Sequence, residues 1–314
     1  MKKTLTTLWQ TDAKLTALGF AMLALLAATG VALLVDPREV VGAPVWMKPA
    51  KFAASIAIYT LTLAWVFSYV PAWSRTRRVV SWVTVVTLVL EIVIIDVQAW
   101  RGTTSHFNVG TLVDGVLFSI MGLAIAIQTL TATAVAVALW KQRFADRALG
   151  WALRLGMTIT LVGATTGGLM TQPTREQLDS ARAGHRLSVS GAHTVGAADG
   201  GPGLPGTGWS RQHGDLRVAH FLGLHAIQML SIVALLLARI GWHDVRRVRM
   251  VWAISASYVS LFALLLWQAL RGQSVTAPDS ATLTALALWA LLTALAVGIA
   301  SVRRESARVH AIVY

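Results

Sequence analysis

The sequence predicts an all-α, polytopic membrane protein with eight transmembrane helices arranged as two pseudo-repeated four-helix units. Of its 314 residues, 55% are apolar and only 13% are charged, which is about half the charged fraction of an ordinary soluble domain. The apolar residues lie in blocks of about 20, the length that a helix needs to cross a bilayer core. Similar segments also recur in the two halves of the chain at a nearly constant spacing.

The apolar blocks are predicted to be helices because backbone groups in lipid must be hydrogen-bonded within their own segment. A membrane barrel would need alternating segments of about ten residues, and the sequence has none of these. The first block is longer than the roughly 7–15 apolar residues of a signal peptide, so a retained helix is expected. The predicted helices span residues 15–35, 52–70, 79–99, 112–139, 151–171, 216–238, 250–270 and 281–300.

Lys and Arg residues set the predicted orientation, since the short cytoplasmic segments of inner-membrane proteins are enriched in them. With the N-terminus in the cytoplasm, the cytoplasmic segments contain 16 of these residues and the exoplasmic segments contain 10. The exoplasmic total is raised by the long connection 172–215, which counts for little in this rule. We therefore expect a multi-pass protein of a bacterial inner membrane with both termini in the cytoplasm.

The net charge of +13 does not indicate nucleic-acid binding, because the basic residues form short clusters between the apolar blocks. The membrane orientation explains those clusters, so the lipid bilayer is the first predicted partner. The chain contains no cysteine, which excludes disulfides, thiolate metal ligands and cysteine nucleophiles.

The connection 172–215 is the only sizeable segment outside the apolar blocks. Thr174 and Gln177 have the spacing of a helix capping box, and Gly184 is placed to end a short helix after it. Residues 200–208 are rich in glycine and proline. Two interpretations of this stretch stay open: a flexible connector, or a lid whose glycines allow close approach to a ligand.

Matched segments predict an internal duplication. Lys48–Phe52 begins the second predicted helix, and Arg217–Phe221 begins the sixth. Gln98–Gly102 and Gln268–Gly272 end the third and seventh helices and share Gln, Ala, Arg and Gly. Each unit has an even number of helices, so both copies have the same orientation in the membrane. The predicted units are residues 1–145 and residues 146–314, with the exoplasmic connection 172–215 as an insertion in the second.

The ionisable residues inside the predicted helices lie mainly on the exoplasmic side. Charged groups at this depth are costly and mark functional sites. Glu91 and His225 are predicted roughly 12–13 Å below the exoplasmic surface, from the helical rise per residue, so we expect them to face each other. The candidate catalytic residues are Glu91, His225 and Asp96, the candidate metal ligands are Glu91 and His225, and the candidate haem or other cofactor ligands are His106, His220 and His225.

A second group of polar residues is expected to line a vestibule for a small-molecule ligand on the same side. Cations around such an opening attract anionic molecules. The group consists of Lys51, Arg101, Arg217, Arg271, Gln228 and Gln268.

Purely structural roles are also open for several of these residues. A Glu91–His225 pair would fasten two helices, and Asp96 would pair with Arg101. Lys48 and Lys51 would extend to the membrane interface. The histidines of the long connection are expected to be solvated; they are His185, His193 and His213.

Known membrane enzymes give little guidance, so the sequence leaves open whether the protein is an enzyme. It contains no His-Glu-x-x-His motif of zinc proteases. The spacing of His220 and His225 resembles one helix of rhomboid proteases, but the Gly-x-Ser-Gly nucleophile motif of that family is missing. The twice-four layout resembles haem A synthase, whose haem-ligating histidines lie in both halves. The second, fourth and eighth predicted helices contain no histidine.

Three function classes therefore stay open. The first is a redox protein that binds haem or a divalent metal through imidazole groups between helices. The second is a transporter or receptor for a small polar or anionic solute, a class in which fused repeats are common. The third is a structural membrane assembly subunit. The sequence identifies no substrate, redox partner or oligomeric state.

Overall fold

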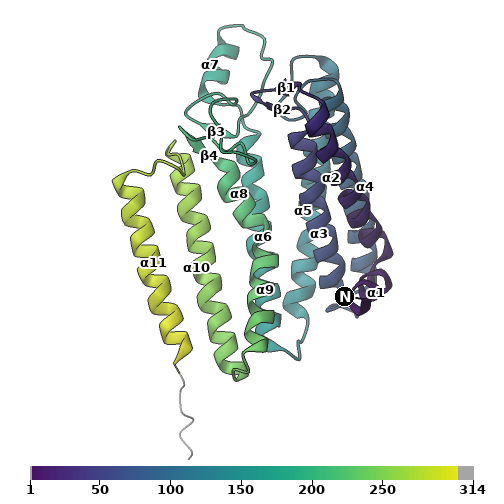
Figure 1. Cartoon of the computed structure of the whole chain (residues 1–314), viewed down its shortest axis with the longest axis vertical. Coiled ribbons are helices and arrows are strands. Elements are labelled where there is room, and N and C mark those ends of the chain that lie inside the picture. Colours follow the sequence, from purple (N-terminus) through teal and green to yellow (C-terminus); the bar gives the residue numbers. More distant parts are fainter. Residues whose placement is uncertain (1, 303–314) are drawn as a thin grey trace, which may run out of the picture.

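A computed structural model describes residues 2–302, which form a bundle of long helices running side by side (Figure 1). One end of the bundle, the loop end, carries residues 36–46, 101–111, 171–215 and 271–279, and the opposite end carries α1. The elements in chain order are α1 (Lys2–Thr11), α2 (Ala13–Val35), β1 (Glu39–Val40), β2 (Ala43–Pro44), α3 (Met47–Phe67), α4 (Ser74–Trp100), α5 (Leu112–Lys141), α6 (Arg147–Met170), α7 (Arg175–Arg182), β3 (Thr194–Val195), β4 (Gly214–Asp215), α8 (Leu216–Leu224), α9 (Ala226–Arg239), α10 (Asp244–Leu270) and α11 (Ser280–Ser301).

The helices have the length and composition of membrane spans. Among the described residues, seven helical segments pass this test, and there are eight if the bent pair α8–α9 counts as one span. Large apolar side chains cover the outside of the bundle; Leu34 is 86% exposed and Leu112 is 80% exposed. A soluble protein does not expose apolar surface on this scale. The predicted mainly helical membrane protein is thus confirmed.

The predicted helix 216–238 is wrong in one respect, because the chain bends by 46° between α8 and α9, at His225. Such a break leaves backbone groups without helical partners. The Tyr258 hydroxyl donates to the carbonyl oxygen of Leu222 at 2.6 Å, and the Thr160 hydroxyl accepts from the Ile227 amide at 3.2 Å. Side chains of α10 and α6 therefore stabilise the bend, and local sequence does not reveal them.

The helices of the two halves pack in the same pairs. In the first half, α2 packs on α3 and α4, α3 packs on α4, and α4 packs on α5. In the second half, α6 packs on α8–α9 and α10, α8–α9 pack on α10, and α10 packs on α11. Helices α5 and α6 contact each other and join the halves.

Glycines bring α6 and α8 unusually close together. A Cβ atom at Gly163 would lie 2.5 Å from the Cα atom of Gly223, so the two backbones meet without side chains between them. Gly167, one turn further along α6, faces the imidazole ring of His220. The close approach thus fixes the position of a candidate site residue.

The loop end is folded into a compact cover. The strands β1 and β2 form one antiparallel pair, and β3 and β4 form another. The capping box of Thr174 and Gln177 begins α7, and Gly184 follows that helix with φ of +84°, as predicted. The glycine-rich stretch folds back on itself through hydrogen bonds that include Leu204 N to Trp209 O at 2.8 Å.

Candidate functional site at the loop end

Glu91 is the most deeply buried carboxylate of the candidate site. It lies in α4 and is 1% exposed. Its Oε1 atom is 3.4 Å from Nε2 of His106, and its Oε2 atom has no hydrogen-bond partner among the described residues. A buried carboxylate oxygen without a partner is costly, so a ligand, a proton or water at this atom would be stabilising.

The structure gives Glu91 a different histidine partner from the one predicted. The expected Glu91–His225 pair is not formed, because α8 packs mainly against α6 and α10 and not against α4. The connection from α4 to α5 instead folds back and brings His106 to Glu91. Depth along a helix follows from residue number, but it does not specify which helices are neighbours.

His106 is held in a mostly aromatic environment. Its ring packs against Phe52 and Phe118, with centroid distances of 5.6 and 6.4 Å. Burial, together with the charges of Lys48 and His193, lowers the pKa of His106 well below 6.5. The imidazole is therefore neutral at physiological pH and lies in contact with the Glu91 carboxylate without a charge of its own.

Three cationic side chains from both halves lie near one another, and one of them, Lys48, acts on both Glu91 and His106. Lys48 interacts electrostatically with Glu91, Arg217, Asp199 and Lys51. Lys51 Nζ donates to the carbonyl oxygen of Thr207 at 2.8 Å, and Arg217 Nη2 donates to that of Gly208 at 2.6 Å. The turn of the glycine-rich stretch is thus held between one cation from α3 and one from α8.

Acidic residues balance part of this positive charge. Arg217 forms an ion pair with Asp215 at 2.6 Å, and Asp199 pairs with His193. Among the ion pairs of the described residues, none joins Lys51 to a carboxylate. Lys51 therefore has only a neutral backbone acceptor where an anionic group would bind more strongly.

His193 is not solvated, contrary to the prediction. Its side chain is 23% exposed, its Nδ1 lies 2.7 Å from Asp199, and its ring packs on Phe107 at 4.8 Å. Burial lowers the pKa of His193, against the opposing effect of Asp199. Burial also opposes the charge on Asp199, but the hydrogen bonds from His193 and from backbone amides hold the pKa of Asp199 below its usual range.

His220 contacts α6, a helix of the second half of the chain. Nδ1 of His220 lies 2.9 Å from the carbonyl oxygen of Gly163 and 3.0 Å from the Thr166 hydroxyl. Nε2 of His220 has no hydrogen-bond partner among the described residues. His225 ends α8 at the bend. Neither residue reaches Glu91, so the candidate ligands are divided between two places.

Two arginines of the predicted vestibule cap helices instead. Arg101 pairs with Asp114 at 2.7 Å and not with Asp96, whose Oδ1 atom is buried without a partner. Arg271 pairs with Asp279. In both cases the arginine joins the end of one helix to the start of the next.

The predicted glutamines also differ in their contacts. Gln228, in α9, donates to the Thr62 hydroxyl of α3 at 3.3 Å and so bridges the halves, whereas Gln268 donates to the carbonyl oxygen of Ser274 at 2.9 Å. Within residues 2–302, no group of three or more His, Asp or Glu side chains is arranged to hold a metal ion.

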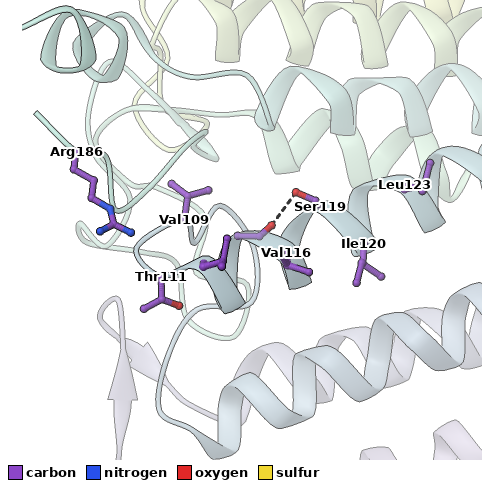
Figure 2. A pocket seen from close by; sticks show the side chains of 9 residues that line it. Val109, Thr111, Val116, Ser119, Ile120, Leu123 and Arg186 are labelled. Atoms are coloured by element: carbon purple, nitrogen blue, oxygen red, sulfur yellow. Dashed lines mark hydrogen bonds between the residues drawn. The ribbon is translucent and has the colours of Figure 1, made fainter. Parts of the chain in front are cut away.

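An open hollow of about 590 Å³ lies apart from this cluster, beside the outer part of α5. Figure 2 shows Val116, Ile120 and Leu123 along its wall and Arg186 of the long connection at one end. The lining is mainly apolar and contains none of the candidate residues. The hollow is thus a crease in the apolar surface of α5 and not the predicted site.

A buried polar network below Glu91 was not predicted. It consists of hydroxyl and amide side chains from α3, α4 and α5. The available signal was the spacing of hydroxyl residues at intervals of three in an otherwise apolar block, on one face of the predicted helix. Its members are Tyr59, Thr84, Thr87 and Gln128, and Ser81, one turn from Thr84 on α4, bonds separately to Asp12.

Comparison with protein-family models, with curated proteins and with solved structures finds no match to this chain. The functional argument therefore depends on the geometry of the chain itself.

Proposed function

We propose that this protein binds and transports a small polar or anionic solute at an exoplasmic site of a bacterial inner membrane. The main supporting observation is that Lys51 and Arg217 hold the turn by hydrogen bonds to the neutral carbonyl oxygens of Thr207 and Gly208. A ligand carboxylate or phosphate forms stronger, charge-assisted hydrogen bonds with the same two groups. Its arrival would release the turn, which then acts as a lid.

The proposed orientation places the loop end outside and both termini in the cytoplasm, with α8–α9 as a single bent span. The excess of Lys and Arg in the connections at the opposite end supports it. Two parallel four-helix units, 1–145 and 146–314, are part of the proposal. Gly102 and Gly272 have φ angles of +71° and +74°, and each follows an arginine that pairs with an aspartate near the start of the next helix.

Glu91 supplies the second half of the proposed site. Its partnerless Oε2 is an acceptor for a donor group of the solute, while Lys51 and Arg217 donate hydrogen bonds to an anionic group of the solute. A molecule with both kinds of group, such as a small zwitterion or a hydroxy acid, fits this combination. Binding between repeats, near buried charges, is typical of secondary transporters.

Titration calorimetry in nanodiscs tests the proposal, with glycine, succinate and inorganic phosphate as probes. Losing one charge-assisted contact costs about 1.5–3 kcal/mol, so Lys51→Gln and Arg217→Gln should weaken binding roughly 10- to 100-fold. The control is Arg182→Gln, since Arg182 is exposed and pairs only with Asp179 on α7. Binding of none of the probes, or equal affinity in Lys51→Gln and wild type, contradicts the proposal.

A second candidate is a haem- or metal-binding redox protein, as the sequence first suggested. The favouring observation is that His193 and His220 each have Nδ1 engaged, by Asp199 and by Gly163, while Nε2 has no protein partner among the described residues. This arrangement orients an imidazole for ligation. An optical spectrum with elemental analysis tests it: colourless, metal-free protein from cells supplied with haem and metals excludes this function.

A further inference from the structure

Helix α4 carries a line of buried polar side chains that leads away from Glu91 towards the opposite end of the bundle. Ser81, Thr84, Thr87 and Glu91 are spaced three, three and four residues apart and therefore share one face of the helix. Ser81 and Thr84 are 0% exposed and Thr87 is 7% exposed. Ionisable groups within a membrane span are rare and can form proton relays, whereas Ser and Thr hydroxyls are common there and hydrogen-bond between helices.

Hydrogen bonds join this line to neighbouring helices. Gln128 of α5 donates to the Thr84 hydroxyl at 3.1 Å and to the Tyr59 hydroxyl at 3.0 Å. The Thr87 hydroxyl has three acceptors within reach: Oε1 of Gln128 at 3.2 Å and the carbonyl oxygens of Val83 at 2.7 Å and Thr84 at 3.3 Å. A hydroxyl with several acceptors can turn between them, as a proton relay requires.

The line ends at a second buried carboxylate. The Ser81 hydroxyl donates to Oδ1 of Asp12 at 2.9 Å, and Asp12 is 8% exposed at the start of α2. From Ser81 to Glu91 the helix rises about 15 Å, roughly half of a bilayer core. His106 continues the line from Glu91 to the loop end, so titratable groups stand at both ends.

We propose that α4 provides a proton path between Glu91 at the loop end and Asp12 at the opposite end. A proton leaves the Glu91 carboxyl group and enters a hydrogen-bonded file of hydroxyls and water, in which each oxygen accepts one proton and releases another. The last proton protonates the Asp12 carboxylate, and Glu91 is left ionised until it is reprotonated from the loop end. Gln128 transfers no proton; it orients the Thr84 and Thr87 hydroxyls.

The proposed path includes bridging waters, because among the described residues no direct hydrogen bond joins Glu91 to Thr87 or Thr84 to Ser81. Glu91 and Thr87 are one helical turn apart, as are Thr84 and Ser81, which corresponds to a rise of about 4.5–6 Å. One bridging water spans such a separation at little cost. A network that only holds helices together would explain the hydrogen bonds of Gln128, whose amide group has partners for its oxygen and its nitrogen. It would not explain why Oε2 of Glu91, at the loop end of the line, is buried without a partner.

The path shares Glu91 with the proposed solute site. Its proposed use, the coupling of solute transport to proton transport, therefore rests on the proposed function. The path itself is tested without solute. Failure of solute binding and failure of proton movement are therefore separate results.

Proton flux into liposomes containing the purified protein and a trapped pH-sensitive dye is the direct measurement. A potassium gradient with valinomycin supplies the driving potential. Wild-type protein should acidify the interior faster than protein-free liposomes do. Thr84→Val with Thr87→Val, and separately Glu91→Gln, should lower the protein-dependent flux by about tenfold or more, because each removes a transfer group.

Matched variants separate proton transfer from folding. Thr84→Ser with Thr87→Ser keeps both hydroxyls and should retain the flux. The control Thr129→Val with Thr131→Val changes two half-buried threonines of α5 whose hydroxyls bond only to their own helix, and it should leave the flux unchanged. Flux equal to that of protein-free liposomes, or full flux in the folded double valine variant at positions 84 and 87, overturns the proposal.

Discussion

The close approach of α6 and α8 predicts that Gly163→Ala destabilises the protein and disturbs His220. A Cβ atom at Gly163 would lie 2.5 Å from Cα of Gly223 and 2.8 Å from the amide nitrogen of Leu224. Non-bonded carbons are separated by about 3.5–4.0 Å, so the two helices must move apart by roughly 1 Å. Backbone atoms on both sides leave no flexible side chain that can yield. Overpacking of this kind costs about 1–3 kcal/mol.

Thermal unfolding followed by tryptophan fluorescence in one detergent measures the effect. A cost of this size lowers the unfolding midpoint by about 2–10 °C. Gly122→Ala is the control, since a Cβ atom there meets nothing within 4 Å. Separation of the helices should also lengthen the hydrogen bond between His220 Nδ1 and the carbonyl oxygen of Gly163 and shift the imidazole resonances of His220 in NMR spectra. Equal midpoints for the Gly163→Ala and Gly122→Ala proteins would refute the reasoning.

Three further predictions concern the loop end and the membrane topology. The pKa of His193 lies below 6.5 and that of Asp199 lies below 3.8. The unfolded segment therefore binds more protons than the folded one, and the stability of the folded segment falls as the pH decreases through about 6.5. Hydrogen exchange of residues 193–199, corrected for the intrinsic effect of pH, should be faster at about pH 5 than at pH 7.5, and unchanged protection contradicts this. Asp279 caps α11, so Asp279→Ala should cost about 0.5–2 kcal/mol in chemical unfolding, whereas Ser280→Ala, at an exposed neighbouring position, should have little effect. Reporter fusions test the proposed topology. Fusions after Arg78, Arg147 and Arg249 should report the cytoplasm, and fusions after Phe107, Ser190 and Ser274 should report the exoplasmic side. A reversed pattern at two or more connections contradicts the topology.

The sequence by itself determined the class of protein and most of its helices. Apolar blocks must form internally hydrogen-bonded helices in lipid, so block length alone located the spans. Local rules also held where their cause is local: the capping box of Thr174 and Gln177 begins α7, and Gly184 follows it. Glu91 was predicted as a candidate because a carboxylate inside an apolar helix is costly in any arrangement of helices, and it is 1% exposed.

Only the tertiary structure decided which polar groups meet. The position of a residue along a helix follows from its number, but the neighbour of each helix face depends on packing. The sequence therefore paired Glu91 with His225, whereas the structure places Glu91 against His106. The bend at His225 depends on Tyr258 and Thr160 from other helices. The long connection placed His193 near the site by contacts with distant residues such as Phe107. The line from Glu91 to Asp12 emerged in the same way, since hydroxyl spacing on α4 becomes a path only when α2, α3 and α5 supply partners.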